Sequence, residues 1–117
     1  MESNVVDKPW GWENRWAVNE RYIGKILHIN KGHKLSLQYH EKKDETIYVL
    51  NGTLNLHLGT GENAKIIVLH TGDNYRITPG VVHRFEAPGD GSDVEIIEVS
   101  SPEINDVVRL HDVYGRS

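Results

Sequence analysis

The stretch at residues 32–40 reads GHKLSLQYH and continues to Glu45 and Gly52, so that two glycines bound it. A second segment runs from Gly72 through Pro79-Gly80 to His83. Four side chains in these segments are of types that bind metals, namely Gln38, His40, Glu45 and His83. Imidazole, carboxylate and amide ligands leave coordination positions open for water or substrate, as in catalytic sites. The pattern therefore predicts one metal centre that carries out chemistry.

The rest of the chain has the pattern of short β-strands. In residues 54–58 three leucines alternate with polar residues, and this period of two is typical of a half-buried strand. Similar segments, rich in β-branched and aromatic residues, are separated by turns that contain Gly, Pro or Asn. We expect these strands at residues 22–30, 35–40, 46–50, 64–70, 74–78, 82–87 and 94–100. Strands this frequent predict an all-β sandwich or small barrel with little helix.

Strand parity adds a lysine to the predicted metal site. Side chains at alternate positions share one face of a strand, so Lys34 and Ser36 are expected beside Gln38 and His40. A hairpin would bring Glu45 back to His40. The charged side chains of the intervening turn are expected in solvent.

Length and composition favour one domain. The chain has 117 residues, and we expect a single domain over 1–117 in which residues 1–20 pack on a barrel core at 21–100 and residues 101–117 form a C-terminal segment. Thirteen Lys and Arg against seventeen Asp and Glu give a net charge of −4, which offers no basic excess for nucleic acid. Because cysteine is absent, disulfides and thiolate-bound zinc are excluded.

Nothing in the sequence suggests membrane association. No apolar run approaches the roughly 18 residues of a membrane span. The N-terminus, Met-Glu-Ser-Asn, lacks the basic and apolar regions of a signal peptide. The cytoplasm is the expected location.

The two glycine-bounded segments resemble the two motifs of the cupin superfamily. The first has the complete motif spacing, Gly-x5-Gln-x-His-x4-Glu-x6-Gly, and in the second His83 follows Gly72 by eleven residues. Cupins are small antiparallel β-barrels, also called double-stranded β-helices or jelly rolls, with a metal inside. The resemblance implies that fold, with Gln38, His40, Glu45 and His83 as ligands. Gln38 stands where the motif usually has His, and in this the chain resembles phosphomannose isomerases.

More of the chain is similar to type II phosphomannose isomerases, the cupin domain of bifunctional isomerase/mannose-1-phosphate guanylyltransferases. The matching segments are residues 8–13 (KPWGWE), 34–38 (KLSLQ), 77–86 (ITPGVVHRFE), 97–99 and the closing Tyr114-Gly115-Arg116. Two departures bear on substrate selectivity. Residues 41–47 lack the family's His/Arg-rich turn and its His-Trp after the ligand Glu, and Lys34 replaces an Arg. No part resembles a guanylyltransferase, so a stand-alone cupin is expected.

The resemblance implies a metal-dependent isomerase that interconverts mannose 6-phosphate and fructose 6-phosphate, or a closely related sugar phosphate. Moving a proton between adjacent carbons of the open-chain sugar needs a Lewis acid at the carbonyl and a base. One divalent ion is expected, zinc first, with manganese, iron, cobalt and nickel as alternatives that accept the same ligands. The candidate catalytic residues are Lys34, on the ligand face, and Glu98, whose carboxyl pKa burial in an apolar strand would raise.

Lys25 and Arg84 are the candidate substrate-binding residues. Parity turns Arg84 away from His83, so phosphate binding by Arg84 would need a bulge or a dimer contact. Structural alternatives stay open, because both lysines could extend into solvent and Glu98 could lie on a surface edge strand.

The two ends of the chain are expected to cover the barrel. Trp10, Trp12 and Trp16 either wall a sugar site or close the open end of the barrel, and we prefer the second interpretation. Residues 106–116 are expected across a sheet edge or a second subunit, because an uncovered edge invites pairing. A homodimer is therefore expected.

Two other functions remain open, a sugar-binding or regulatory cupin without turnover and a metal-dependent dioxygenase. An isomerase works without oxygen, whereas a dioxygenase requires oxygen and iron. A binding module would show ligand-dependent stabilisation without turnover.

Overall fold

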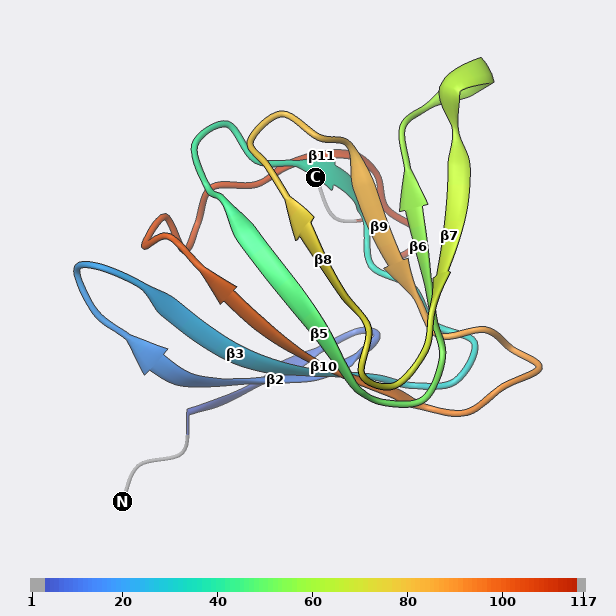
Figure 1. Ribbon diagram of the computed structural model, residues 1–117, viewed down its shortest axis with the longest axis horizontal. Helices are drawn as coiled ribbons and strands as arrows, with labels where there is room; N and C mark the ends of the chain where they lie inside the picture. The colour runs from blue at the N-terminus through green and yellow to red at the C-terminus, as the bar shows by residue number, and fades with distance from the viewer. Residues whose placement is uncertain (1–3, 116–117) are drawn as a thin grey trace.

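Two antiparallel sheets face each other in the computed structural model, which describes residues 4–115 (Figure 1). Sheet A contains, in spatial order, β1 (Val5–Lys8), β2 (Gly11–Val18), β3 (Ile23–Ile29), β10 (Val94–Ser100), β5 (Glu45–Asn51) and β8 (Asn74–Ile77). Sheet B contains β11 (Val108–His111), β4 (Leu37–Tyr39), β9 (His83–Glu86), β6 (Leu54–Leu58) and β7 (Lys65–Leu69). Within the described residues the only helix is the short 3-10 helix η1 (Gly61–Asn63), and the predicted all-β fold is confirmed.

Most predicted strands are present, but β4 is shorter than expected. Residues 35–40 were predicted to be one strand, and this is wrong at both ends because β4 covers only Leu37–Tyr39. Lys34 makes only an isolated bridge to Glu86. Strands β1, β2 and β11 were not predicted. In β2 the side chains that face the interior include the charged Glu13 and Arg15, so the usual apolar inward face is missing there.

The apolar core fills the space between the sheets. Ile47 and Val49 of β5 face Leu54 and Leu56 of β6 across this space, and all four side chains are fully buried. Burying each one stabilises the fold by about 1.5–3 kcal/mol. Polar side chains gather toward one end of the same space, where β5 begins at Glu45 and β9 at His83.

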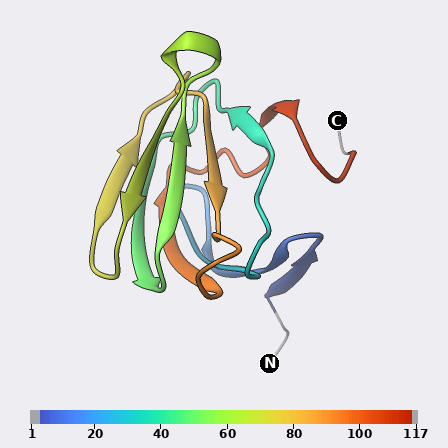
Figure 2. The same ribbon diagram turned by 90° about the vertical axis from the view of Figure 1, so that its right-hand side faces the viewer.

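The chain ends extend the two sheets. β1 and β2 lengthen sheet A, and β11 lies beside β4 at the edge of sheet B (Figure 2). In this pair Arg109 lies opposite Gln38. The C-terminal segment thus lies along a sheet edge, one of the two expected positions. Arg116, which completes the family-like ending, lies outside the described residues.

The three tryptophans occupy different environments. Trp10 belongs to the core, Trp12 stacks on His28 with ring centroids 5.1 Å apart, and Trp16 is half-exposed above Gly24. Trp10 belongs to the core and also lines the cavity between the sheets, so it fits both interpretations, whereas the interpretation as core is wrong for the half-exposed Trp16. No helix of the described residues is long and apolar enough to cross a membrane.

His28 of β3 contacts two carboxylates, Asp93 just before β10 and Glu95 within it. Its Nε2 lies 3.1 Å from Asp93 Oδ2 and its Nδ1 lies 2.9 Å from Glu95 Oε2. Burial lowers the pKa of His28, but the two carboxylates outweigh burial and raise the pKa above its ordinary value. The stabilisation is therefore fully present below the unfolded-state pKa of about 6.5 and is lost as pH rises through the folded-state pKa.

We expect His28→Gln to lower Tm by about 2–5 °C near pH 5.5 and by much less near pH 8.5, because only the charged imidazole is attracted to the two carboxylates. Calorimetry of both proteins at the two pH values measures this difference. The exposed His70→Gln serves as the control. Equal losses at both pH values would show that the charge of His28 contributes nothing.

Candidate metal centre

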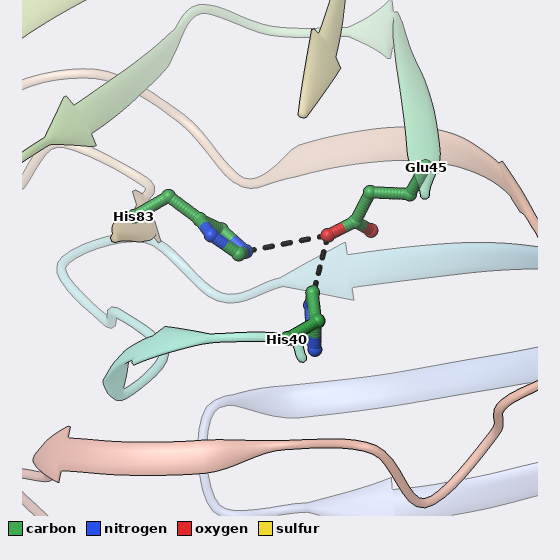
Figure 3. Close-up of side chains that lie close together, drawn as sticks. All are labelled: His40, Glu45 and His83. Carbon is green, nitrogen blue, oxygen red and sulfur yellow. Dashed lines mark hydrogen bonds and ion pairs between the residues drawn. The ribbon is translucent and has the colours of Figure 1, made fainter. Parts of the chain in front are cut away.

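Three side chains meet at the polar end of the barrel (Figure 3). His40 follows β4, Glu45 begins β5 and His83 begins β9. Glu45 Oε1 lies 2.9 Å from His40 Nε2 and 3.3 Å from His83 Nε2. The three ligand atoms lie within 4.8 Å of one another and all three residues are buried, so this group could hold one metal ion.

Backbone pairing brings these residues together. Gln38 of β4 pairs with His83 of β9, which sets the register of the two strands. The N–H of Gly80 donates to the His40 carbonyl at 2.7 Å and fastens the turn before β9 to the end of β4. Gly80 has φ 85, a left-handed conformation that suits glycine in this turn.

The second ring nitrogen of each histidine is already engaged. His83 Nδ1–H donates to the Val81 carbonyl at 2.9 Å, and His40 Nδ1–H donates to the Asp106 carbonyl. Each Nε2 therefore faces Glu45, with a lone pair available to a cation when the ring is neutral and with an N–H that can donate to the carboxylate when the ring is protonated. Metal-binding histidines commonly have this arrangement. Two lone pairs facing a carboxylate oxygen repel it unless a cation lies between them, so the donor set fits a divalent ion.

Gln38 lies on the wall of the same site. Its amide nitrogen donates to Ser36 Oγ at 3.0 Å and to the Ser36 carbonyl at 3.3 Å. This leaves the amide oxygen as the atom suited to a cation. Gln38 as a fourth ligand remains a prediction.

A buried lysine lies behind the ligand group. Lys43 Nζ is 3.1 Å from Glu98 Oε2 and 4.0 Å from Glu45 Oε2. The expectation that the turn charges lie in solvent is wrong for Lys43, whose side chain is only 6% exposed. Lys43 thus offsets the charge of two buried carboxylates.

Asp106 fixes the conformation of this turn. Its carboxylate accepts the backbone N–H groups of Glu41, Lys42 and Lys43 at 3.1, 2.7 and 2.9 Å. The backbone N–H of Lys42 and those of its neighbours hold the pKa of Asp106 below its ordinary value. Asp106 therefore holds this turn against the C-terminal segment, and Lys43 is directed inward.

The two buried carboxyls differ in pKa. Burial raises the pKa of Glu45, but hydrogen bonds from His40 and His83, with the charge of Lys43, outweigh burial and hold this pKa well below its usual range. Burial raises the pKa of Glu98 to about 7; the Glu45 charge adds to the rise, and Lys43 opposes it. A carboxyl that exchanges its proton near neutral pH beside a candidate metal site is typical of acid–base catalysis.

A cavity of about 340 Å³ opens over the ligand group. Both sheets contribute to its walls. The charged and amide side chains that line it are Lys8, Glu13, Arg15, Lys25, Gln38, Glu45, Glu98, Asn105, Asp106 and Arg109. Its size lies at the low end of the range for small-molecule sites.

The family model described as "Cupin domain" matches residues 25–100. The chain belongs to the cupin family. Its fold is also similar to the structure of KdgF from Halomonas sp., with a TM-score of 0.74 at 20% identity over 86% of this chain and 89% of that chain.

Among curated proteins the cupin is 32% identical to xanthan biosynthesis protein XanB of Xanthomonas campestris over 115 residues, which is 96% of this chain and 24% of that protein. It is 33% identical to mannose-1-phosphate guanylyltransferase ManC of Salmonella typhimurium over 114 residues, 95% of this chain and 23% of that protein. The chain thus spans about a quarter of the length of these relatives. The matches agree with the resemblance inferred from the two motifs.

Only some of the predicted catalytic and substrate-binding residues line the cavity. Glu98 and Lys25 line it, whereas Lys34 and Arg84 are not among the lining residues. The parity argument for Lys34 does not hold because β4 begins only at Leu37, and Leu35 takes a place in the cavity wall.

Arg84 points away from the cavity and holds strands together. Its Nε donates to the Leu35 carbonyl at 2.8 Å, and a terminal nitrogen donates to the His111 carbonyl at 3.1 Å. Burial lowers the pKa of the Arg84 guanidinium. These bonds connect β9 with the segment before β4 and with β11, so the geometry gives Arg84 a structural position.

Sequence reasoning missed Glu13, Arg15 and Lys43. The Glu-x-Arg spacing of the first two was a usable signal, because alternate residues share one face of a strand. It was overlooked because no strand was expected at residues 11–18. No local signal distinguished Lys43 from the other charges of its turn.

We expect purified wild-type protein to bind zinc and to lose stability on chelation, since an ion that binds only the folded state at 100 times its Kd adds about 2.7 kcal/mol. His83→Ala should lose both the bound zinc and the chelator effect. Elemental analysis combined with thermal unfolding measures this. His57→Ala, which breaks a pair with Glu86 at 2.8 Å, is the matched control. Full zinc content in His83→Ala would contradict the assignment.

We expect Lys43→Met to destabilise the fold by about 3–5 kcal/mol, because it leaves two buried carboxylates without their cation. Adding Glu98→Gln should restore much of the loss, since it removes one of those charges. Urea unfolding of the two single variants and the double variant gives the coupling energy. Additive losses would indicate that Lys43 and Glu98 do not interact.

Proposed function

We propose that this cupin is a metal-dependent aldose–ketose isomerase that interconverts mannose 6-phosphate and fructose 6-phosphate, or a closely related sugar phosphate. The observation that carries the proposal is one cavity that contains both the ligand group and Glu98, a buried carboxyl with a pKa of about 7. The motif resemblance to type II phosphomannose isomerases supports this substrate class. Similarity to a mannose-1-phosphate guanylyltransferase also supports it.

His40, Glu45 and His83 would hold the ion, with Gln38 as the predicted fourth ligand. Bound there, a divalent ion would supply the Lewis acid that polarises the sugar carbonyl. Zinc is the first candidate. The expected homodimer and cytoplasmic location are part of the same proposal.

Glu98 is the proposed base. Its carboxylate would take the proton from C2 of the open-chain aldose and return it to C1, while the hydroxyl proton on O2 passes to O1, and the reverse reaction would use the same positions. Lys43 holds Glu98 Oε2 at 3.1 Å and so fixes the carboxyl in the cavity. Trp10, Leu35 and Phe85 provide apolar wall that limits water around the transferred proton.

We expect Glu98→Gln to lower kcat for mannose 6-phosphate isomerisation about 10²–10⁴-fold, because the amide cannot accept the C2 proton. The zinc content should stay unchanged. A coupled assay for fructose 6-phosphate with zinc-loaded protein measures the rate. Glu95→Gln, on the same strand but the opposite face, is the control.

Other outcomes would separate the alternatives. Full activity in Glu98→Gln would remove Glu98 from the mechanism. A zinc-loaded wild type that is stabilised by mannose 6-phosphate but never converts it would be a binding module. Oxygen-dependent consumption of a substrate by iron-loaded protein would identify a dioxygenase.

A further inference from the structure

A group of three cations surrounds one carboxylate on the wall of the cavity. Glu13 Oε2 lies 2.9 Å from Lys25 Nζ and 3.3 Å from Arg15 Nε, and Glu13 Oε1 lies 3.3 Å from Lys8 Nζ. All four residues line the cavity that contains the candidate metal ligands. Three cations against one carboxylate leave an excess of two positive charges in this group.

The three cations differ in how firmly they are held. The Lys25 side chain is 10% exposed and makes the shortest contact with Glu13, and Glu98 of β10 is its cross-strand neighbour. Arg15 and Lys8 are more exposed, at 31% and 22%, and make the longer contacts. Lys25 is therefore held by its ion pair with Glu13, whereas Arg15 and Lys8 can turn toward an incoming anion.

The backbone of β2 is irregular at Arg15, which agrees with a side chain that can turn toward an anion. The pairing of β2 with β3 shifts register between Asn14 and Ala17, an irregularity that includes Arg15. Such bulges often redirect side chains beside active sites. Glu13 stays charged, because burial raises its pKa but Lys25, Lys8 and Arg15 outweigh burial and lower it below the ordinary value. Its carboxylate limits repulsion among the cations before an anion arrives.

We propose that Arg15 and Lys8 form a binding site for the phosphate of a sugar phosphate, with the Glu13 carboxylate limiting repulsion among the cations until the phosphate binds. A phosphate monoester carries a charge of about −1.5 to −2 near pH 7, which matches the excess of two positive charges. The phosphate would lie against sheet A with the sugar extending toward the metal ligands. Phosphate binding is thus assigned to this site instead of to Arg84, whose guanidinium donates to backbone carbonyls.

The inference rests on the proposed isomerase function, but it can be tested separately. Calorimetric titration of zinc-loaded protein with inorganic phosphate needs no turnover. Arg15→Gln should weaken phosphate binding about 10- to 100-fold, as expected for loss of a charge-assisted hydrogen bond. Any phosphate bound by the metal itself is common to both proteins and cancels in the comparison.

Glu13→Gln gives a result that a merely structural ion cluster would not. Removing this carboxylate raises the excess charge, so phosphate should bind more tightly. Lys8→Gln, at a more exposed position, should weaken binding in the same sense as Arg15→Gln. Arg21→Gln, outside the cavity in the loop between β2 and β3, is the matched control and should bind as wild type does.

The kinetic test divides the effect between KM and kcat. Arg15→Gln should raise KM for mannose 6-phosphate about 10- to 100-fold while kcat changes little, because a remote binding contact is lost. Turnover with unchanged KM in both Arg15→Gln and Lys8→Gln would overturn the inference and leave the isomerase intact. Phosphate binding that weakens in Arg15→Gln without any wild-type turnover would support the anion site and reject the isomerase.

Discussion

The ionised carboxylate of Glu45 is buried inside the barrel, and the rest of the structure depends on offsetting its charge. Desolvating such a group costs several kcal/mol unless partners surround it. Two histidines and Lys43 do so from one side. Lys43 in turn needs Glu98, Glu98 lies opposite Lys25, and Lys25 is paired with Glu13. The result is a row of alternating charges across β5, β10, β3 and β2, neighbouring strands of sheet A.

This row divides the interior of the barrel into two parts. Toward one end, apolar side chains such as Val49, Leu54 and Ile96 are fully buried and supply the stability. Toward the other, the same strands present charges to a cavity, and those charges are held by one another. A substitution at the apolar end is expected to act on the free energy of unfolding. One in the charge row is expected to act both on the free energy of unfolding and on the proposed chemistry, because each member neutralises its neighbours.

Sequence patterns predicted the parts of this arrangement that follow from motif spacing and from strand alternation. The spacing of His40, Glu45 and His83 and the alternation in β6 follow from strand geometry, and the structure brings the first three together. β2 escaped detection because its inward side chains are polar, which inverts the usual apolar signal. Lys34 was misplaced because parity was extended beyond the start of β4. Lys43 is buried by contacts with Asp106 and Glu98, which lie far along the chain and leave no local trace.

Because Asp106 holds His40 and the turn at residues 41–43, this part of the site can reach its final conformation only after the C-terminal segment has been synthesised. The carbonyl of Asp106 fixes the tautomer of His40, and its carboxylate holds the turn that directs Lys43 inward, from a position 66 residues beyond His40. During synthesis, the strands that carry all three ligands leave the ribosome before Asp106 does. A nascent chain would therefore contain every ligand while the imidazole of His40 was still unoriented and Lys43 still outside. Binding of the proposed ion in its final geometry would thus be a late step, after the C-terminal segment has packed at the end of the barrel.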